Sequence, residues 1–266
     1  MGDQVRKAQQ FRALHVKGRP LLLFNIWDAG SARAALESGA RAIGTSSWAV
    51  ANANGYRDGE ETPLALVIDN LQRIVTLTDA PVTIDLESGY GDNPVLVGET
   101  VARAINAGAV GCNLEDSVPG EGRLRDAAGQ AARIREARRA GDAAVMPLFI
   151  NARTDVFFRS PPEQHEQPML KETLERARRY ADSGADGLFV PGLIDLRLIA
   201  ALVEASPLPV NVMMADGAPA VATLADHGVA RISYGAHPYL LAMQALQHAA
   251  TAAAQSVDRD LRLRSA

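Results

Sequence analysis

The sequence predicts a (β/α)8 TIM barrel with an N-terminal helix before it and a further helix at its C-terminus. Short apolar runs alternate with segments of helical periodicity along the whole 266-residue chain. Eight such runs can be placed, which is the strand number of this barrel. Several helical segments end in Ser-Gly-Ala or Ala-Gly-Ala, where glycine supplies a left-handed C-cap before the next strand.

The expected strands are short and mainly aliphatic. We place them at residues 21–27, 42–46, 82–86, 111–115, 148–152, 187–190, 210–213 and 231–234. Helical spacing is found at residues 62–78, 97–107, 127–140, 169–183, 218–226 and 236–254. No linker divides residues 1–266, so one barrel domain is expected. An open doubly wound sheet is the alternative, but no GxGxxG follows the first strand.

The composition of the chain argues against several classes of partner and location. The net charge of −4 and the lack of a basic cluster argue against nucleic acid. No apolar run is long enough to cross a membrane, and the first ten residues lack the apolar core of a signal peptide. The single cysteine, Cys112, excludes an intrachain disulfide and is expected to be a buried thiol. We therefore expect a cytoplasmic protein.

Acidic residues follow two neighbouring strands. Asp85 and Glu87 are two residues apart, so on a strand both side chains would point to the same face. Glu115 ends the next strand, and the C-terminal ends of barrel strands meet at the face where active sites form. Carboxylate oxygens suit Mg²⁺, with Mn²⁺ as the alternative ion. Each acid could instead cap a helix or pair with an arginine.

Other strand ends offer groups for an anionic substrate. Arg153 alternates with Asn151 and Asp155 on a buried strand and can bind a carboxylate through two N–H groups, although a structural ion pair is the alternative. Asn211, on the seventh strand, is a further expected substrate contact. By contrast, the arginines of the segment 127–140 are expected to form a solvated face; these are Arg133, Arg135, Arg138 and Arg139.

In several blocks the chain resembles the isocitrate lyase and phosphoenolpyruvate mutase superfamily. The blocks are FNIWDAGSARAALESGARAIGTSS, DLESGYG, NLED, INARTD and ISYG, and their order is more specific than any one of them. The resemblance implies Mg²⁺ held near Asp85, Glu87 and Glu115, largely through water. It also implies that the last helix is exchanged with a neighbouring subunit in a homodimer or homotetramer.

The resemblance further implies how a small carboxylate substrate is held. The turn of Ser46, Ser47 and Trp48 would offer backbone N–H groups to the substrate carboxylate, and Arg153 would bind the anion. Asp58 would lie on a loop over the site, where it is the candidate for handling a proton or a water molecule.

These residues lead to a first hypothesis: a Mg²⁺-dependent lyase that cleaves a C–C bond in a small 2-oxo or 2-hydroxy carboxylate through a metal-stabilised enolate. The chain departs from the superfamily pattern at Glu87, where aspartate is usual, and in the segment 116–124, which has no cysteine or histidine. Two alternatives stay open: C–P chemistry, as a phosphonopyruvate or phosphoenolpyruvate mutase or hydrolase, and binding of a 2-oxo acid without turnover.

Overall fold

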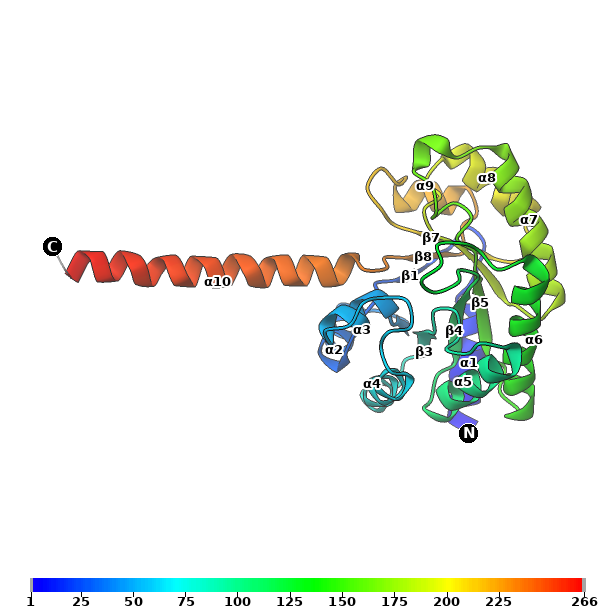
Figure 1. Ribbon diagram of the computed structural model, residues 1–266, viewed down its shortest axis with the longest axis horizontal. Coiled ribbons are helices and arrows are strands. Elements are labelled where there is room, and N and C mark those ends of the chain that lie inside the picture. The colour runs from blue at the N-terminus through cyan, green and yellow to red at the C-terminus, as the bar shows by residue number, and fades with distance from the viewer. Residues whose placement is uncertain (1, 265–266) are drawn as a thin grey trace.

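The computed structural model describes the backbone of residues 2–264 and the side chains of residues 2–255, and at its centre is one sheet of eight parallel strands (Figure 1). The strands are β1 (Leu21–Leu23), β2 (Ile43–Gly44), β3 (Val82–Asp85), β4 (Gly111–Glu115), β5 (Phe149–Arg153), β6 (Gly187–Val190), β7 (Val210–Met213) and β8 (Arg231–Ser233). Their order is β1-β8-β7-β6-β5-β4-β3-β2. Ile26 joins the two end strands, because its N–H donates to Gly44 O (2.9 Å) and its carbonyl accepts from Ser46 N–H (3.0 Å). The predicted (β/α)8 barrel is confirmed.

The predicted bounds agree with the observed ones for three strands and differ for the other five. The strands at 111–115, 187–190 and 210–213 have the predicted bounds. The first strand ends at Leu23, because beyond it the pairing continues as an isolated bridge between Ile26 and Thr45. The fifth strand starts and ends one residue later than predicted. Arg153 is therefore part of β5 and lies in register beside Glu115 of β4.

Helices surround the sheet (Figure 1). They are α2 (Ala29–Glu37), α3 (Ser47–Ala53), α4 (Leu64–Thr76), α5 (Pro94–Asn106), α6 (Ala127–Ala143), α7 (Gln167–Asp182), α8 (Leu196–Ala205) and α9 (Val221–Asp226), with a 3₁₀ turn at Pro162–Gln164. The sequence predicted only a turn at the start of α3. The structure forms a helix there because the Ser46 hydroxyl accepts from Ala49 N–H (3.4 Å) and caps it.

The N-terminal helix α1 (Gly2–Ala13) covers the end of the barrel where the strands begin. Phe11 is fully buried against Phe149, the first residue of β5, with ring centroids 5.4 Å apart. His15 stacks on the same ring at 4.0 Å, and burial lowers the pKa of His15 to about 3. The helix predicted before the barrel is confirmed, and it closes the end opposite the strand-end acids.

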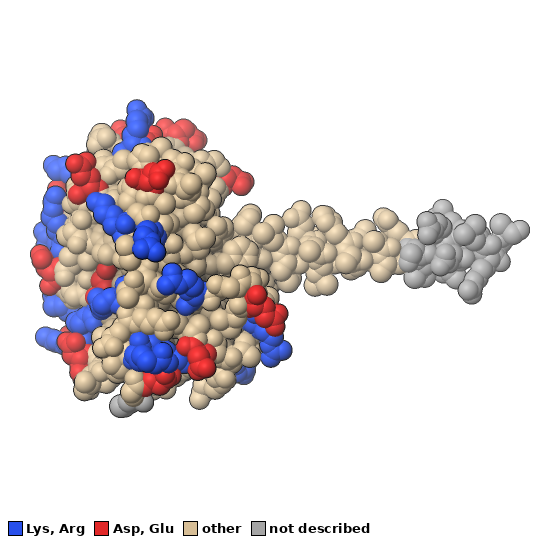
Figure 2. Space-filling view, turned by 180° about the vertical axis from the view of Figure 1, so that it is seen from behind, with Lys and Arg blue, Asp and Glu red and all other residues tan. Residues whose placement is uncertain are grey.

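The C-terminal helix α10 (His237–Arg264) projects from the barrel instead of packing on it (Figure 1). Its 28 residues span about 42 Å. Side chains 237–255 include no Lys, Arg, Asp or Glu, and this part of the helix is uniformly tan in Figure 2, whereas charges of both signs are mixed on the barrel. In the part of the chain that the structure describes, no helix is both long and apolar enough to span a membrane.

The predicted solvated arginine face of α6 is wrong for two of its four members. Arg133 is 2% exposed and donates to the backbone carbonyls of Ser88 and Gly91. Arg138 is partly buried, donates to the carbonyl of Gly184 and pairs with Asp186. Long arginine side chains can reach backbone carbonyls on neighbouring loops, so their charge alone does not make them solvent-facing.

Candidate active site

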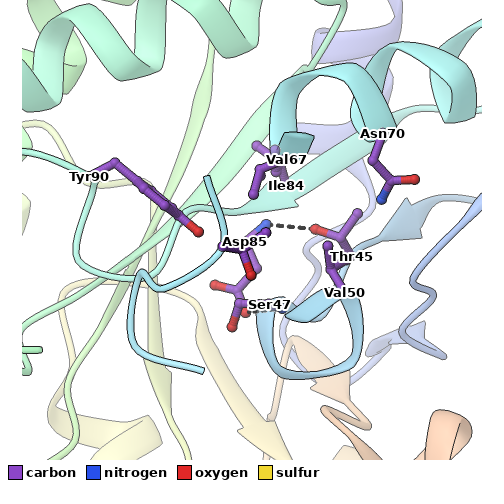
Figure 3. Close-up of a pocket in the computed structure, with 9 residues that line it drawn as sticks. Thr45, Ser47, Val50, Val67, Asn70, Ile84, Asp85 and Tyr90 are labelled. Atoms are coloured by element: carbon purple, nitrogen blue, oxygen red, sulfur yellow. Dashed lines mark hydrogen bonds between the residues drawn. The ribbon is translucent and has the colours of Figure 1, made fainter. Parts of the chain in front are cut away.

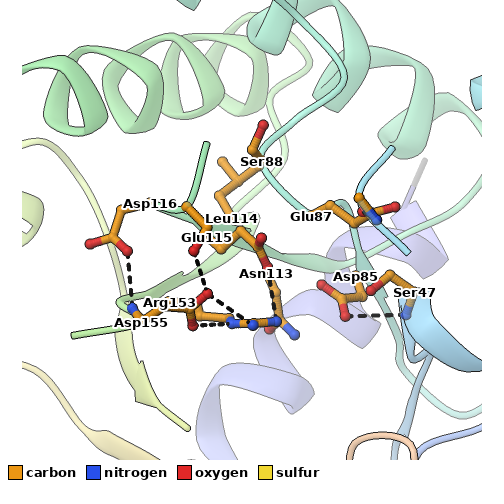
Figure 4. Close-up of polar contacts among 12 residues, drawn as sticks. Ser47, Asp85, Glu87, Ser88, Asn113, Leu114, Glu115, Asp116, Arg153 and Asp155 are labelled. Carbon is orange, nitrogen blue, oxygen red and sulfur yellow. Dashed lines mark hydrogen bonds and ion pairs between the residues drawn. The ribbon is translucent and has the colours of Figure 1, made fainter. Parts of the chain in front are cut away.

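The carboxyl ends of three neighbouring strands bring Asp85, Glu115 and Arg153 together at the mouth of the barrel (Figure 4). Asp85 lies in register with Asn113, two residues before Glu115 on β4. The Arg153 guanidinium Nη1 is 2.8 Å from a Glu115 carboxylate oxygen. Glu115 thus pairs with Arg153, and Asp85 ends the next strand of the sheet; the roles of these three residues as metal ligands and substrate contact stay predictions.

Arg153 is held by contacts on several sides. Its Nε donates to Asp155 Oδ1 (2.6 Å) and its Nη2 to Asp155 Oδ2 (3.0 Å). The guanidinium carbon also lies 5.4 Å from the ring centre of Phe158 and 5.9 Å from that of Phe189. Burial disfavours the charge, but the carboxylates of Glu115 and Asp155 outweigh it and raise the pKa of Arg153. The arginine is therefore a fixed cation.

Asp85 has one engaged and one unengaged carboxylate oxygen. Its Oδ2 accepts from the backbone N–H of Ser47 (3.2 Å), while its Oδ1 is buried without a hydrogen-bond partner. Asp85 also lines a cavity of about 10 Å³ with Thr45, Ser47 and Tyr90, which is room for about one water molecule (Figure 3). A buried carboxylate oxygen without a donor is costly, so this atom calls for a cation or a water.

Glu115 and Asp58 have perturbed proton affinities. Burial raises the pKa of Glu115, and Arg153 works in the opposite direction. Asp58 lies on the exposed loop after α3. Desolvation by the surrounding protein atoms raises the pKa of Asp58, and the nearby charge of Asp85 raises it further. A hydrogen bond from the Ser47 side chain lowers it. Asp58 is thus close enough to Asp85 for their charges to interact, and its role over the site stays a prediction.

Glu87 does not share the orientation of Asp85. The argument from strand alternation fails here because β3 ends at Asp85 and Glu87 has a left-handed backbone (φ 50°). Its Oε2 accepts from the backbone N–H groups of Gly59 (2.7 Å) and Glu60 (2.6 Å), and its Oε1 from the Tyr90 hydroxyl (2.8 Å). Burial, followed by the charge of Asp58, raises the pKa of Glu87 to about 7. Its role as a metal ligand stays a prediction.

The turn of Ser46, Ser47 and Trp48 forms the start of α3. The N–H groups of Ser46 and Ser47 are engaged by Ile26 O and by Asp85. The Trp48 ring lies 5.9 Å from the ring of Tyr239, the third residue of α10. The turn therefore lies beside the acidic cluster, and its contact with a substrate stays a prediction.

Asn211 lies deeper, in a polar layer that crosses the barrel interior. Its Oδ1 accepts from the amide of Asn151 (3.1 Å) and from the hydroxyl of Ser233 (3.2 Å). Arg231 is also fully buried in this layer, and burial lowers its pKa to about 9. The sequence analysis did not identify this layer, although polar residues in otherwise aliphatic strands were a visible signal. A substrate contact for Asn211 stays a prediction.

Asp155 is a site residue that the sequence analysis noted but did not assign. Besides Arg153, it accepts from the Ser117 hydroxyl (2.6 Å), and its own N–H donates to Asp116 (3.0 Å). Asp116 is in turn bound by Arg176 and by the Tyr180 hydroxyl (2.8 Å). The alternation of Asn151, Arg153 and Asp155 was the signal that could have identified it.

The described residues include no group of three or more His, Cys, Asp or Glu side chains arranged to hold a metal ion by themselves. The acids at the mouth are either paired, as Glu115 is with Arg153, or bound to backbone N–H groups, as Glu87 is. Asp85 Oδ1 is the exception. Any divalent ion at this mouth would need water or substrate oxygens to complete its coordination.

Comparison with known proteins places the chain in a family. Residues 11–254 match the family described as phosphoenolpyruvate phosphomutase. A 2-methylisocitrate lyase from Salmonella typhimurium (strain LT2) is 29% identical over 250 residues, covering 91% of this chain and 81% of the lyase. A solved structure from Burkholderia cenocepacia J2315, a proposed phosphonomutase, is 56% identical and covers 94% of this chain and 99% of its own, with a TM-score of 0.92.

A more distant neighbour shares the fold. Phosphonopyruvate hydrolase, solved in complex with oxalate and Mg²⁺, is 20% identical and has a TM-score of 0.82, covering 94% of this chain and 87% of its own. The barrel, the order of the sequence blocks and the family match agree with one another. The chain belongs to the phosphoenolpyruvate phosphomutase family, within the superfamily that also includes the isocitrate lyases.

Proposed function

We propose that the chain is a Mg²⁺-dependent lyase that cleaves a carbon–carbon bond in a small 2-oxo or 2-hydroxy carboxylate. The observation that carries this proposal is that one barrel mouth contains both a buried oxygen of Asp85 without a hydrogen-bond partner and the fixed cation of Arg153. A chelating keto acid needs both a metal-binding carboxylate and a binding site for its own negative charge. The similarity to 2-methylisocitrate lyase supports C–C cleavage.

The residues fit a hard cation held largely through water. Asp85 has a free oxygen, and Glu115 at the next strand end is the further carboxylate that would contact Mg²⁺ or Mn²⁺. Glu87, whose oxygens accept from Gly59, Glu60 and Tyr90, would act on the ion through water. Mg²⁺ commonly uses one or two carboxylates and keeps several waters, which agrees with a site that lacks three converging ligands. When bound, the ion would polarise the substrate oxygens and stabilise the enolate left by bond cleavage. A structural neighbour solved with oxalate and Mg²⁺ supports this choice.

The chain's own groups would bind the substrate and move its proton. Three of the five N–H donors of Arg153 are engaged by Asp155 and Glu115, which leaves two for a substrate carboxylate. At the start of α3 the N–H groups of Ser46 and Ser47 are engaged by Ile26 and Asp85, so the Trp48 N–H is the group of this turn that would contact the same anion. Asp58, whose pKa is raised above its usual value, is the group proposed to give or accept the proton. Asn211 would help to orient the substrate from below.

A second candidate is C–P chemistry, as a phosphonopyruvate or phosphoenolpyruvate mutase or hydrolase. It is favoured by the 56% identity to a proposed phosphonomutase, because the same Arg153 cation could bind a phosphonate. Binding of a 2-oxo acid without turnover is the third candidate. It is favoured by residues 116–124, which lack the cysteine and histidine of the superfamily lyases.

The test is a substrate panel assayed with Mg²⁺ and with a chelator. It contains 2-oxo and 2-hydroxy dicarboxylates, phosphonopyruvate and phosphoenolpyruvate. We expect chelator-sensitive C–C cleavage that is lost in Asp85→Asn. The matched control is Asp79→Asn, which removes an exposed carboxylate that precedes β3 at the opposite end of the barrel. Turnover of phosphonopyruvate or phosphoenolpyruvate alone would contradict the lyase proposal, and Mg²⁺-dependent binding of a 2-oxo acid without product would favour the third candidate.

We also propose that α10 is exchanged between subunits in a homodimer or homotetramer. A groove of about 750 Å³ beside β1 exposes Leu22 (44%) and Phe24 (46%). The projecting α10 exposes Leu240 (50%) and Leu246 (63%) and is uncharged over residues 237–255. Light scattering after size exclusion should show a dimer or tetramer that dissociates in Leu240→Glu/Leu246→Glu. A monomeric parent protein would contradict the proposal.

A further inference from the structure

Two loops at the barrel mouth are bound to each other by reciprocal hydrogen bonds. We call residues 56–62 the Asp58 loop and residues 87–91 the Glu87 turn. From the turn, the Glu87 carboxylate accepts from the N–H groups of Gly59 (2.7 Å) and Glu60 (2.6 Å). From the loop, the Glu60 carboxylate accepts from the Ser88 hydroxyl (2.7 Å) and from Tyr90 N–H (2.8 Å). Each segment thus supplies a carboxylate that binds the other segment's donors.

The backbone conformations at this junction are unusual. Four non-glycine residues of the described chain have a positive φ, and three of them belong to the junction: Glu60 (64°), Glu87 (50°) and Tyr90 (53°). Left-handed backbone is unfavourable for residues with a Cβ and persists where surrounding contacts enforce it. In Glu87 this conformation turns the carboxylate away from the line of β3 and towards the Asp58 loop.

The turn is anchored from behind, whereas the loop is held at its two ends, by Tyr56 N–H on Ala51 O (3.0 Å) and by the buried Thr62, and is exposed in its middle at Asp58. Arg133 of α6 donates through Nη2 to the carbonyls of Ser88 (2.7 Å) and Gly91 (2.8 Å). Glu87 and Ser88 are buried, at 3% and 1% exposure, while Asp58 is exposed. The Glu87 turn is therefore the fixed partner, and the Asp58 loop depends on it for its position.

We propose that Glu87 is a positioning residue that holds the Asp58 loop over the barrel mouth and so places the Asp58 carboxyl beside Ser47 and Asp85. The catalytic part of this inference rests on the proposed function of Asp58, whereas the holding of the loop does not. A carboxyl group is suited to this task because one of its oxygens accepts from both Gly59 and Glu60 N–H while the other accepts from Tyr90 of its own turn. The length of glutamate also matters, since Glu87→Asp withdraws the acceptor by one methylene.

Hydrogen exchange of the full chain, read by mass spectrometry without substrate, tests the holding of the loop. We expect Glu87→Ala and Glu87→Gln to speed exchange in peptides containing residues 59 and 60 by about tenfold or more, with Glu87→Asp between them and the parent. Peptides from α5 and α6 should exchange as in the parent protein, which shows that the barrel is folded. The matched control is Glu61→Gln, because Glu61 lies on the same loop and pairs only with the exposed Arg57 (3.1 Å). Unchanged exchange at residues 59 and 60 in both Glu87→Ala and Glu87→Gln would overturn the proposal.

Two further measurements separate positioning from metal binding and from the proposed function. Calorimetric Mg²⁺ titration should give a Kd for Glu87→Gln within about threefold of the parent, whereas Asp85→Asn should abolish binding. With a substrate from the panel, Glu87→Gln should lower kcat at least tenfold with little change in KM. An unchanged kcat despite faster loop exchange would overturn the positioning of Asp58. If no panel substrate reacts, the proposed function fails, and the exchange result still decides whether Glu87 holds the loop.

Discussion

Replacement of Arg153 by methionine should strongly destabilise the protein, because it leaves two carboxylates without their cation at the barrel mouth. The Arg153 side chain is 15% exposed, that of Glu115 is 16% and that of Asp155 is 3%. Removal of one partner from a buried ion pair costs about 3–5 kcal/mol, since the remaining charge stays buried. We expect Arg153→Met to lose about that much free energy of unfolding at pH 8, measured by urea denaturation.

The loss should depend on pH in a defined direction. Without Arg153, the pKa of Glu115, already raised by burial above its usual 4.5, rises further. A folded-state pKa above the unfolded one means that the folded protein binds more protons, so its stability falls as pH rises between those two values. The deficit of Arg153→Met should therefore be smaller at pH 5 than at pH 8. Arg153→Met/Glu115→Gln should recover part of it.

Arg139→Met is the matched control, because Arg139 is 72% exposed and pairs only with Glu136 on the surface of α6. It should change stability by less than about 1 kcal/mol. The reasoning is refuted if Arg153→Met loses no more stability than Arg139→Met, or if its deficit is the same at pH 5 and pH 8. Either result would mean that Glu115 and Asp155 are solvated or otherwise neutralised.

Three further predictions concern other buried groups. Burial raises the pKa of the Cys112 thiol to about 12, so a thiol-specific disulfide reagent should label it only after unfolding; rapid labelling of the native protein would contradict this. Arg133→Met should lower the free energy of unfolding by about 2 kcal/mol, since the carbonyls of Ser88 and Gly91 lose their charged donor. A loss below about 0.5 kcal/mol, which is the usual range of surface substitutions, would contradict this. The folded protein raises the pKa of Glu87 from its usual 4.5 to about 7, so in chelator this group makes the free energy of unfolding fall as the pH rises between those values. The free energy of unfolding of Glu87→Gln should not show this fall.

The barrel could be predicted because its signals are local and repeated. Short aliphatic strands that alternate with amphipathic segments, several of which end in a C-cap glycine, fix both element type and order. The gathering of Asp85, Glu115 and Arg153 follows from topology alone, since parallel strands place their carboxyl ends on one face. The strand ends were less accurate, because the last residues of a strand depend on contacts with loops.

The orientation of Glu87 could not be predicted, because it depends on a single backbone angle after the strand has ended. Alternation holds only while the chain is extended, and a φ of 50° breaks it. The helix that begins after Ser46 was not predicted either, because it depends on a hydrogen bond from Ala49 N–H to the Ser46 hydroxyl. The burial of Arg133 was likewise hidden, since its carbonyl partners on the loop at Ser88 and Gly91 lie far away in sequence.

The closure of the barrel base by α1 has a consequence for how the chain assembles. The helix is synthesised before the strands that it covers, and Phe149, the ring on which Phe11 rests, is translated long after it. Gln4 likewise donates to carbonyls at Ile105 and Ala109, which also come later. Until those strands emerge, α1 has no surface to dock on. We therefore expect α1 to dock on the end of the barrel where the strands begin at a late stage of folding.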